Sequence, residues 1–208
     1  MLKFNIQKNI NLLNYTTIKV GGQTEYFAEP TNISELENIL KWASDKNINC
    51  QIFGAGSNLL ISGNIWKGLF ICTKKLKAIN LNPKTGILEA ESGVMLPAIS
   101  NLLAKNSCKG GEWSIGIPGT VGGAIFMNAG YGDFSISKHL VSVKVIDIQT
   151  LNIFNISRKD LNFKYRFSPF QKNKLIILSA KFYFEPGGDK YLITKVTKAN
   201  LKKKTDSQ

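Results

Sequence analysis

The 208-residue sequence is poor in the side chains that most catalytic and metal sites need. It contains one histidine, His139, and three cysteines, Cys50, Cys72 and Cys108, which lie far apart. None of them has a second cysteine or a histidine at zinc-ligand spacing, and no nucleophile or acid motif surrounds His139. We therefore predict no metal site, three reduced and buried thiols, and a structural or surface role for His139.

Long apolar runs are also missing. No stretch approaches the roughly 20 apolar residues of a membrane span, and the first residues lack the apolar core and cleavage site of a secretory signal. The sequence has no internal repeat and no low-complexity block, while 43% hydrophobic residues suffice for a real core. We expect a cytoplasmic protein without a membrane partner.

Acidic residues are scarce, at 14 against 27 lysines and arginines, so the formal net charge is +13. Such an excess suits an anionic partner, but charge alone does not choose among nucleotide, phosphate, nucleic acid and membrane surface. The densest run, 202–204, lies near the C-terminus, where a solvated helix face is the usual explanation. Because no zinc-finger, helix-turn-helix or RNA-binding signature accompanies it, we expect no nucleic-acid partner.

The hydrophobic periodicity predicts an α+β fold in two lobes, 1–73 and 74–208. Asn32 and Glu35 form a plausible capping box for the first helix. Two later strands, joined by a turn at 149–152, form a hairpin. The expected strands are 24–28, 50–53, 69–71, 88–91, 141–145, 153–156 and 175–184, and the expected helices are 32–47, 96–109 and 191–204.

Two glycine-rich segments carry most of the functional signal. The first, 54–60, directly follows a strand, and the second, 115–124, holds four glycines and one proline in ten residues. A lone glycine-rich turn is more often ordinary turn chemistry, but the second segment is hard to explain as a simple connection. We predict that both turn backbone N–H groups toward one diphosphate, and that a short helix from Val121 adds its free first-turn amides.

Neither segment matches the Walker or the G-x-G-x-x-G pattern. Four segments together, 16–22, 54–60, 116–130 and 165–170, instead resemble the UDP-N-acetylenolpyruvoylglucosamine reductases, in the family's order and across nearly the whole chain. The resemblance implies a two-lobed FAD-binding fold of the vanillyl-alcohol-oxidase (PCMH) type. It also implies FAD as cofactor, NADPH as co-substrate, and reduction of a UDP-sugar enolpyruvyl ether to UDP-N-acetylmuramate for peptidoglycan, and hence for cell-wall growth, cell shape and division.

The same resemblance assigns roles to individual residues. Arg166 is the expected catalytic group, which stabilises an enolate-like intermediate, although an ordinary salt-bridging arginine is the alternative. Tyr131 and Tyr165 are expected substrate contacts, with a core aromatic an equal alternative for Tyr165. The expected cofactor-binding residues are Gly54, Ala55, Gly56, Ser57, Asn58, Leu59, Ile117, Pro118, Gly119, Thr120, Gly122, Gly123, Asn128 and Gly130.

The sequence departs from the family pattern in two places. Complete members continue into a substrate domain that supplies a serine proton donor, in a Ser-Ala-Gly-Ser type motif, and a late glutamate. No such motif follows Arg166, and the segment 128–132 is one residue shorter than usual. We therefore expect the C-terminal substrate domain to be absent and turnover to be impaired, since general-acid help is worth about 10²–10⁴-fold.

Two other functions stay open at this point. One is a flavin oxidase or dehydrogenase of the same superfamily that acts on another small substrate, although the Tyr165-Arg166 segment argues against it. The other is a basic module that binds FAD, another nucleotide or nucleic acid without turnover. The oligomeric state also stays open.

Overall fold

The N-terminal part of the chain forms a four-stranded sheet in the computed structural model, which describes residues 4–205. The strand order is β1-β2-β4-β3. The strand β4 pairs in parallel with both β2 and β3, while β1 pairs antiparallel with β2 at the edge. The bounds are Gln7–Asn11 for β1, Gln23–Ala28 for β2, Cys50–Phe53 for β3 and Trp66–Cys72 for β4.

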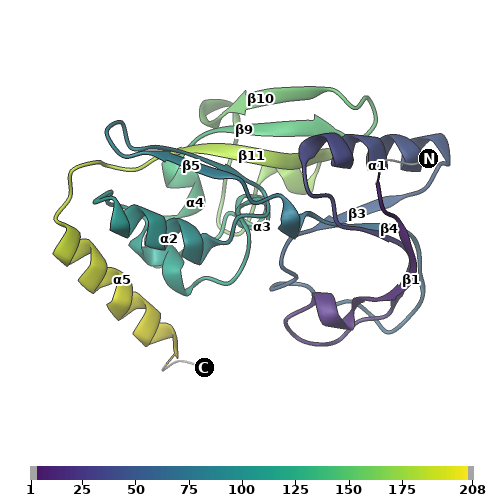
Figure 1. The fold of residues 1–208 in the computed structure, drawn as a ribbon, viewed down its shortest axis with the longest axis horizontal. Coiled ribbons are helices and arrows are strands. Elements are labelled where there is room, and N and C mark those ends of the chain that lie inside the picture. The colour runs from purple at the N-terminus through teal and green to yellow at the C-terminus, as the bar shows by residue number, and fades with distance from the viewer. Residues whose placement is uncertain (1–3, 206–208) are drawn as a thin grey trace.

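Helix α1, Ile33–Asp45, lies along one face of this sheet, next to the end of β11 (Figure 1). Asn32 Oδ1 accepts the Glu35 N–H at 2.8 Å, as the capping box predicts. The Glu35 carboxylate accepts hydrogen bonds from the N–H and the hydroxyl of Thr31, whereas a capping box would have it accept the Asn32 N–H. The buried face of α1 contacts β4 on one side and apolar side chains of β9 and β11 on the other, so this helix joins the two lobes.

A five-stranded antiparallel sheet, in the order β10-β9-β11-β6-β5, forms the second lobe. Short helices lie on one face of it, and α5 packs against α2 and the 3-10 helix η3 (Figure 1). The strands are β5 Ile79–Asn82, β6 Ile87–Glu91, β9 Leu140–Asp147, β10 Ile153–Ser157 and β11 Leu175–Tyr183, with a small hairpin of β7 Gly130–Tyr131 and β8 Phe134–Ser135. The helices are α2 Leu96–Lys105, α3 Val121–Phe126, α4 Ile136–His139 and α5 Lys190–Thr205, and the 3-10 turns are η1 Leu12–Tyr15, η2 Thr73–Lys75, η3 Glu112–Gly116, η4 Arg158–Asp160 and η5 Pro169–Gln171.

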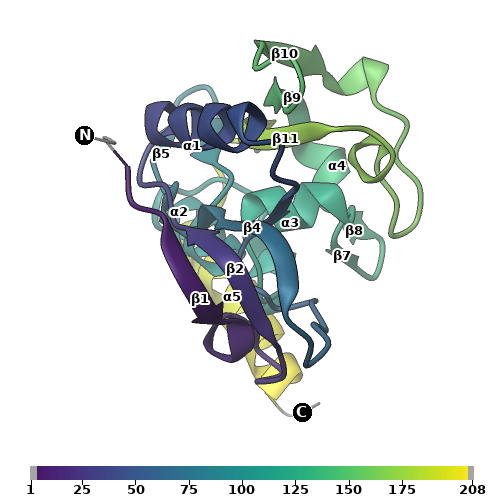
Figure 2. The ribbon, with the colours of Figure 1, turned by 90° about the vertical axis from the view of Figure 1, so that its right-hand side faces the viewer.

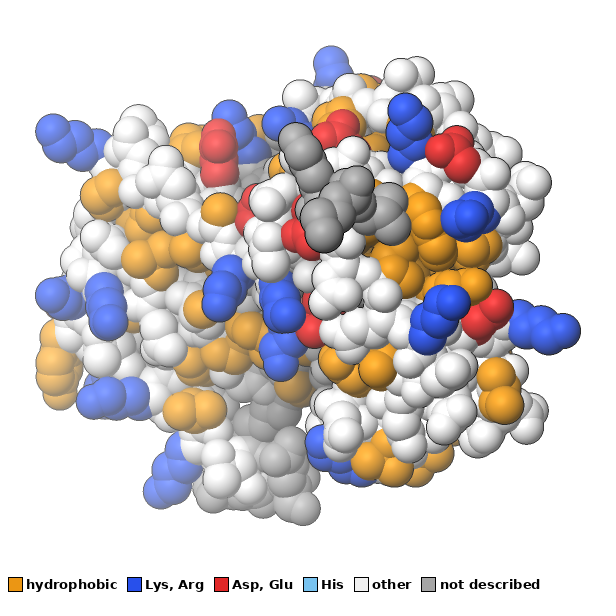
Figure 3. All heavy atoms as spheres, turned by 45° about the vertical axis from the view of Figure 1, so that its right-hand side comes forward, with side chains coloured by type: hydrophobic (Ala, Val, Ile, Leu, Met, Phe, Trp, Pro, Cys, Tyr) orange, Lys and Arg blue, Asp and Glu red, His pale blue; other side chains and the backbone are white. Residues whose placement is uncertain are grey.

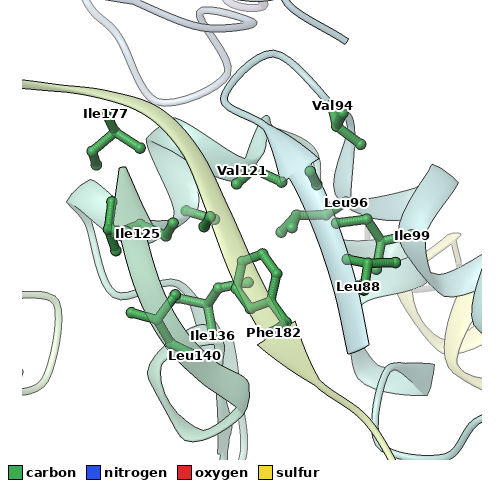
Figure 4. Close-up of a cluster of buried hydrophobic side chains, with 14 of the residues drawn as sticks. Leu88, Val94, Leu96, Ile99, Val121, Ile125, Ile136, Leu140, Ile177 and Phe182 are labelled. Carbon is green, nitrogen blue, oxygen red and sulfur yellow. The ribbon is translucent and has the colours of Figure 1, made fainter. Parts of the chain in front are cut away.

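The main core of the second lobe fills the space between this sheet and its helices. Phe182 of β11 is fully buried and points into the cluster, together with Leu88 of β6 and Val121 and Ile125 of α3 (Figure 4). Burial of apolar surface is worth about 25 cal/mol per Å², so this packing is the main force that holds α3 against the sheet. As a result, the second glycine-rich segment runs into a rigid element.

The predicted α+β class is confirmed, and so are the main predicted strands and helices, to within a few residues. The sequence analysis missed β1, β5 and the β7–β8 hairpin. These strands are short or lie at sheet edges and are partly exposed, so they lack a strong apolar pattern. We propose residue 73 as the lobe boundary, since β1 to β4 end at Cys72. Among the described residues, no helix combines the length and the apolar character that a membrane span needs.

Candidate functional site

The two glycine-rich segments lie against each other. Ser57 Oγ donates a hydrogen bond to the Pro118 carbonyl oxygen at 3.1 Å. A Cβ atom added to Gly54 would stand 2.2 Å from Thr120 Oγ1, and one added to Gly119 would stand 3.3 Å from Ser57 Oγ. The loops can approach this closely only because glycine has no side chain at these positions.

A cleft of about 1160 Å³ opens beside the paired loops and runs between the lobes. This volume exceeds the roughly 300–1,000 Å³ of an ordinary small-molecule pocket and suits a long ligand. Of the residues expected to bind the cofactor, those that line the cleft are Gly54, Ala55, Gly56, Ser57, Asn58, Leu59, Ile117, Pro118, Gly119, Thr120, Gly122 and Gly123.

The charges that line the cleft are all positive. Arg166 and Lys174 line it, and no aspartate or glutamate is present among its described lining residues. Elsewhere the basic side chains are scattered over the surface, as one face of the molecule shows (Figure 3). The cleft therefore favours an anionic ligand locally, independently of the net charge.

Both loops contain backbone amides that have no hydrogen-bond acceptor within the protein. In the part of the chain that the structure describes, the N–H groups of Ala55, Gly56, Ser57 and Asn58 donate no hydrogen bond to the protein. The same holds for Gly119 and Thr120. Six amides of lining residues are therefore without a protein partner, as the donors of an anion nest would be, although Gly56 and Thr120 are themselves buried.

The prediction that α3 offers free first-turn amides is wrong. The Val121 N–H donates to the Val94 carbonyl and the Gly122 N–H to the Ser92 carbonyl, both at 2.8 Å. The Gly123 N–H is directed at the Thr120 side chain, with an N···Oγ1 distance of 3.5 Å. These bonds fix α3 to the segment before α2, so the helix acts as a wall of the cleft.

The segment 16–22 supports the first loop from behind. The Thr17 N–H donates to the Gly56 carbonyl at 3.1 Å, and a Cβ atom on Gly56 would stand 1.9 Å from the Tyr15 carbonyl oxygen. Gly56 has φ +66°, a left-handed conformation that glycine adopts at little cost. This motif of the sequence therefore shapes the loop from outside the main cleft.

Arg166 reaches the cleft from a tight turn, Lys164–Phe167, whose end residues exchange two backbone hydrogen bonds at 3.1 Å. Its Nη2 donates to the Gly130 carbonyl at 3.3 Å. Within residues 4–205 it forms no salt bridge, so the alternative of a salt-bridging arginine is wrong. Tyr165 is 90% exposed, which also excludes the core-aromatic alternative.

Four of the residues named from the sequence stand outside the described lining of the cleft. Asn128 and Gly130 lead from α3 into β7, and Tyr131, 63% exposed, lies in the β7–β8 hairpin. Tyr165 stands at the tip of the neighbouring turn. The hairpin and the turn are joined by the bond from Arg166 to Gly130, so all four lie near the Arg166 end of the cleft.

The sequence analysis missed the opposite end of the cleft. Polar residues there come from the end of α1, the start of β3 and the loops next to β9 and β11. They are Ser44, Asn47, Asn49, Gln149, Asn173 and Lys174. No local motif marks them, because they come from separate parts of the chain and meet only after the lobes pack together.

The cysteines and the histidine are partly or fully buried in the packed structure. Burial raises the pKa of the Cys72 thiol to about 11, and its Sγ donates to the Gly54 carbonyl at 3.4 Å behind the first loop. Burial also raises the pKa of Cys50 to about 11, although Cys50 is only partly buried. His139 stacks on Phe184 at 4.7 Å, and burial lowers its pKa. Residues 4–205 contain no cluster of three or more potential metal-binding side chains.

Comparison with known proteins agrees with this geometry. A family described as FAD binding domain matches residues 24–151. A UDP-N-acetylenolpyruvoylglucosamine reductase of Prochlorococcus marinus subsp. pastoris is 55% identical over all 208 residues, which cover 70% of its length. One from Prochlorococcus marinus strain MIT 9313 is 42% identical over 202 residues, which make up 97% of this chain and 66% of that relative.

A solved structure supports the same assignment at the level of the fold. The UDP-N-acetylenolpyruvylglucosamine reductase from Thermus caldophilus superposes with a TM-score of 0.81 over 99% of this chain and 71% of its own, at 23% identity. At that identity the likeness shows the fold alone, while the sequence relatives carry the family. The chain belongs to the UDP-N-acetylenolpyruvoylglucosamine reductase family, and its fold is the two-lobed FAD-binding fold of the vanillyl-alcohol-oxidase type.

Proposed function

We propose that this chain binds FAD in the cleft between its lobes and takes part in the NADPH-dependent reduction of UDP-N-acetylglucosamine enolpyruvate to UDP-N-acetylmuramate. The observation that carries the proposal is the contact between the two glycine-rich loops, which lie beside the cleft. Among the described residues, six amides of these loops have no protein partner and no acidic side chain lines the cleft. A dinucleotide with a central diphosphate matches this donor set.

The residues present fit FAD in three respects. The amides of 55–58, with those of Gly119 and Thr120, would hold the diphosphate. Gly123 leaves open space beside the wall formed by α3, since a Cβ atom there would meet nothing closer than Thr120 Oγ1 at 3.7 Å. The polar end near Lys174 would take the adenosine part. When bound, FAD supplies the hydride chemistry between the nicotinamide and the enolpyruvyl double bond.

Arg166 is the residue that we propose for the reaction itself. Its guanidinium group is permanently charged and planar, so it would bind the substrate carboxylate and stabilise negative charge that develops beside it. The exposed rings of Tyr131 and Tyr165, near the same end of the cleft, would contact the substrate. Peptidoglycan precursor synthesis in the cytoplasm, with its effects on cell shape and division, would be the biological setting.

These 208 residues do not contain a Ser-Ala-Gly-Ser motif after Arg166. We therefore propose that they bind FAD and accept electrons from NADPH but turn over the enolpyruvyl substrate slowly. General-acid catalysis is typically worth about 10²–10⁴-fold, which sets the size of the expected deficit relative to a relative that has the motif.

The experiment is a flavin titration followed by anaerobic reduction. The purified chain is expected to take up FAD with one saturable site, to bleach on addition of NADPH, and to be reoxidised slowly by the enolpyruvyl sugar nucleotide. Arg166→Ala is expected to slow the reoxidation about 10²-fold or more while FAD uptake is kept. Lys159→Ala, an exposed cation outside the cleft, serves as the matched control. A chain that takes up no FAD would overturn the proposal.

A further inference from the structure

Asn128 connects α3 to the turn that carries Arg166. Its Nδ2 donates to the Lys164 carbonyl oxygen at 2.8 Å, across 36 residues of sequence. That same carbonyl accepts the Phe167 N–H at 3.1 Å, which closes the Lys164–Phe167 turn. The asparagine side chain is therefore bonded to the base of the turn, while its own residue lies outside the described lining of the cleft.

The backbone at both ends of this connection is unusual. Asn128 has φ +43° and Arg166 has φ +53°, both in the left-handed region. Asparagine tolerates this region better than most residues. Arginine adopts it at a cost in free energy, so the surrounding structure must hold the Arg166 backbone in this conformation. Position 128 thus requires a residue that adopts this conformation and also donates a hydrogen bond, and asparagine does both.

Three further hydrogen bonds lie in the same region. Ser168 Oγ donates to the Phe126 carbonyl at 2.7 Å, and Gln171 Nε2 donates to that carbonyl at 2.8 Å and to the Arg166 carbonyl at 3.1 Å. The C-terminal end of α3 is thus bonded to the segment that follows Arg166. These bonds hold residues 168–171, and the bond from Asn128 holds the other side of the turn. Figure 2 shows α3 and the β7–β8 hairpin on the same side of the molecule.

We propose that Asn128 is a positioning residue, which holds the Arg166 turn through the Lys164 carbonyl and does not itself contact the cofactor. The proposal rests on the role of Arg166 in the proposed function. It replaces the cofactor contact expected for Asn128 from the sequence, because Nδ2 is bonded to the Lys164 carbonyl, while Oδ1 is buried and has no hydrogen-bond partner among the described residues.

The experiment compares Asn128→Gly with the wild type, because glycine keeps the left-handed backbone and removes only the donor. Asn128→Asp is the second variant, which keeps the shape but turns a carboxylate oxygen toward the Lys164 carbonyl. Asn9→Gly is the matched control, since Asn9 has φ +54° in the exposed edge strand β1. Hydrogen–deuterium exchange of the Lys164 and Phe167 amides is the primary readout.

The Lys164 and Phe167 amides are expected to exchange about 5-fold faster in Asn128→Gly, faster still in Asn128→Asp, and unchanged in Asn9→Gly. FAD affinity is expected to stay within about 2-fold of the wild type in all three. Unchanged exchange in both Asn128 variants would overturn the proposal. A loss of FAD affinity with unchanged exchange would overturn it too, since Asn128 would then be a cofactor contact.

The link to Arg166 is tested by a double-mutant cycle. Affinity for the enolpyruvyl sugar nucleotide, followed through the flavin spectrum of the FAD-loaded chain, is expected to fall about 5-fold in Asn128→Gly and not to fall further when Arg166→Ala is already present. Equal losses in both backgrounds would show an independent role and contradict the proposal. If the wild type takes up no FAD, the proposed function fails, whereas the exchange measurement still decides whether Asn128 holds the turn.

Discussion

The two loops that meet at the cleft are both rich in glycine, yet their glycines act differently. In the first loop the amides of residues 55–58 are free for a ligand, and Gly56 takes a left-handed conformation that bends the chain. In the second loop the amides of residues 121–123 are already directed at protein acceptors, and Gly122 stands where a Cβ atom would meet Ser92 Cβ at 3.0 Å. Glycine content alone thus does not distinguish an anion-binding loop from a closely packed wall of the cleft. The distinction depends on whether each backbone amide already donates a hydrogen bond within the protein.

The most severe way to break the pairing of the loops is Gly54→Val. The new Cβ would stand 2.2 Å from Thr120 Oγ1, so the first loop must move away from the second. We expect FAD affinity to fall at least about 100-fold and the melting temperature to drop by several degrees, measured by flavin fluorescence and thermal denaturation. Gly63→Val is the control, since nothing lies within 4 Å of a Cβ atom there. Normal FAD uptake by Gly54→Val would contradict the pairing.

The thiol behind the first loop predicts a pH dependence of stability. Burial raises the pKa of Cys72 from 9.0 to about 11, so the folded state holds this proton over a range in which the unfolded state loses it. The protonated thiol therefore stabilises the folded state below pH 9, and this stabilisation is lost as the pH rises to about 11. The free energy of unfolding should fall by about 2–3 kcal/mol over that range. Urea denaturation between pH 8 and 10.5 measures it.

Cys72→Ala isolates that contribution, because lysine and tyrosine side chains also titrate at alkaline pH. The free energy of unfolding of the variant is expected to decline less steeply with pH than that of the wild type. Cys108→Ala serves as a comparison, since burial also raises the pKa of that thiol, which lies in the other lobe. Parallel pH profiles for the wild type and Cys72→Ala would show that the Cys72 thiol does not hold its proton in the folded state.

A change on the wall side tests whether the second loop leaves space for the ligand. In Gly123→Leu the Cβ has room within the protein, but the rest of the side chain would extend into the cleft. We expect FAD affinity to fall about 10-fold with little change in melting temperature, in contrast to Gly54→Val. Gly63→Leu is the matched control, and flavin fluorescence is the readout. Unchanged affinity would place the ligand away from α3.

The smallest expected effect comes from the direct bond between the loops. Ser57→Ala removes the donor to the Pro118 carbonyl at 3.1 Å, an exposed bond worth about 1 kcal/mol, so FAD affinity should fall about 5-fold. Ser62→Ala, an exposed serine beyond the same loop, is the control. A loss in Ser57→Ala as large as in Gly54→Val would indicate that Ser57 binds the ligand itself.

The sequence was sufficient to predict the fold class, the main helices and strands, and the meeting of the two loops. Local signals carried these predictions, such as the cap of α1 at Asn32 and the glycines that follow β3. It was not sufficient to predict the use of the α3 amides, because their acceptors, Val94 and Ser92, lie nearly 30 residues earlier. The polar end of the cleft near Lys174 was missed for the same reason, since tertiary contacts alone bring it together.

The most direct test of the central claim compares the affinity of the chain for FAD and for FMN, which carries the same flavin but has neither the diphosphate nor the adenosine. If the two loops hold a diphosphate through their free amides, FAD should bind at least about 100-fold more tightly than FMN, and Gly54→Val should remove most of that preference. Equal affinity for FAD and FMN in the wild type would contradict the account.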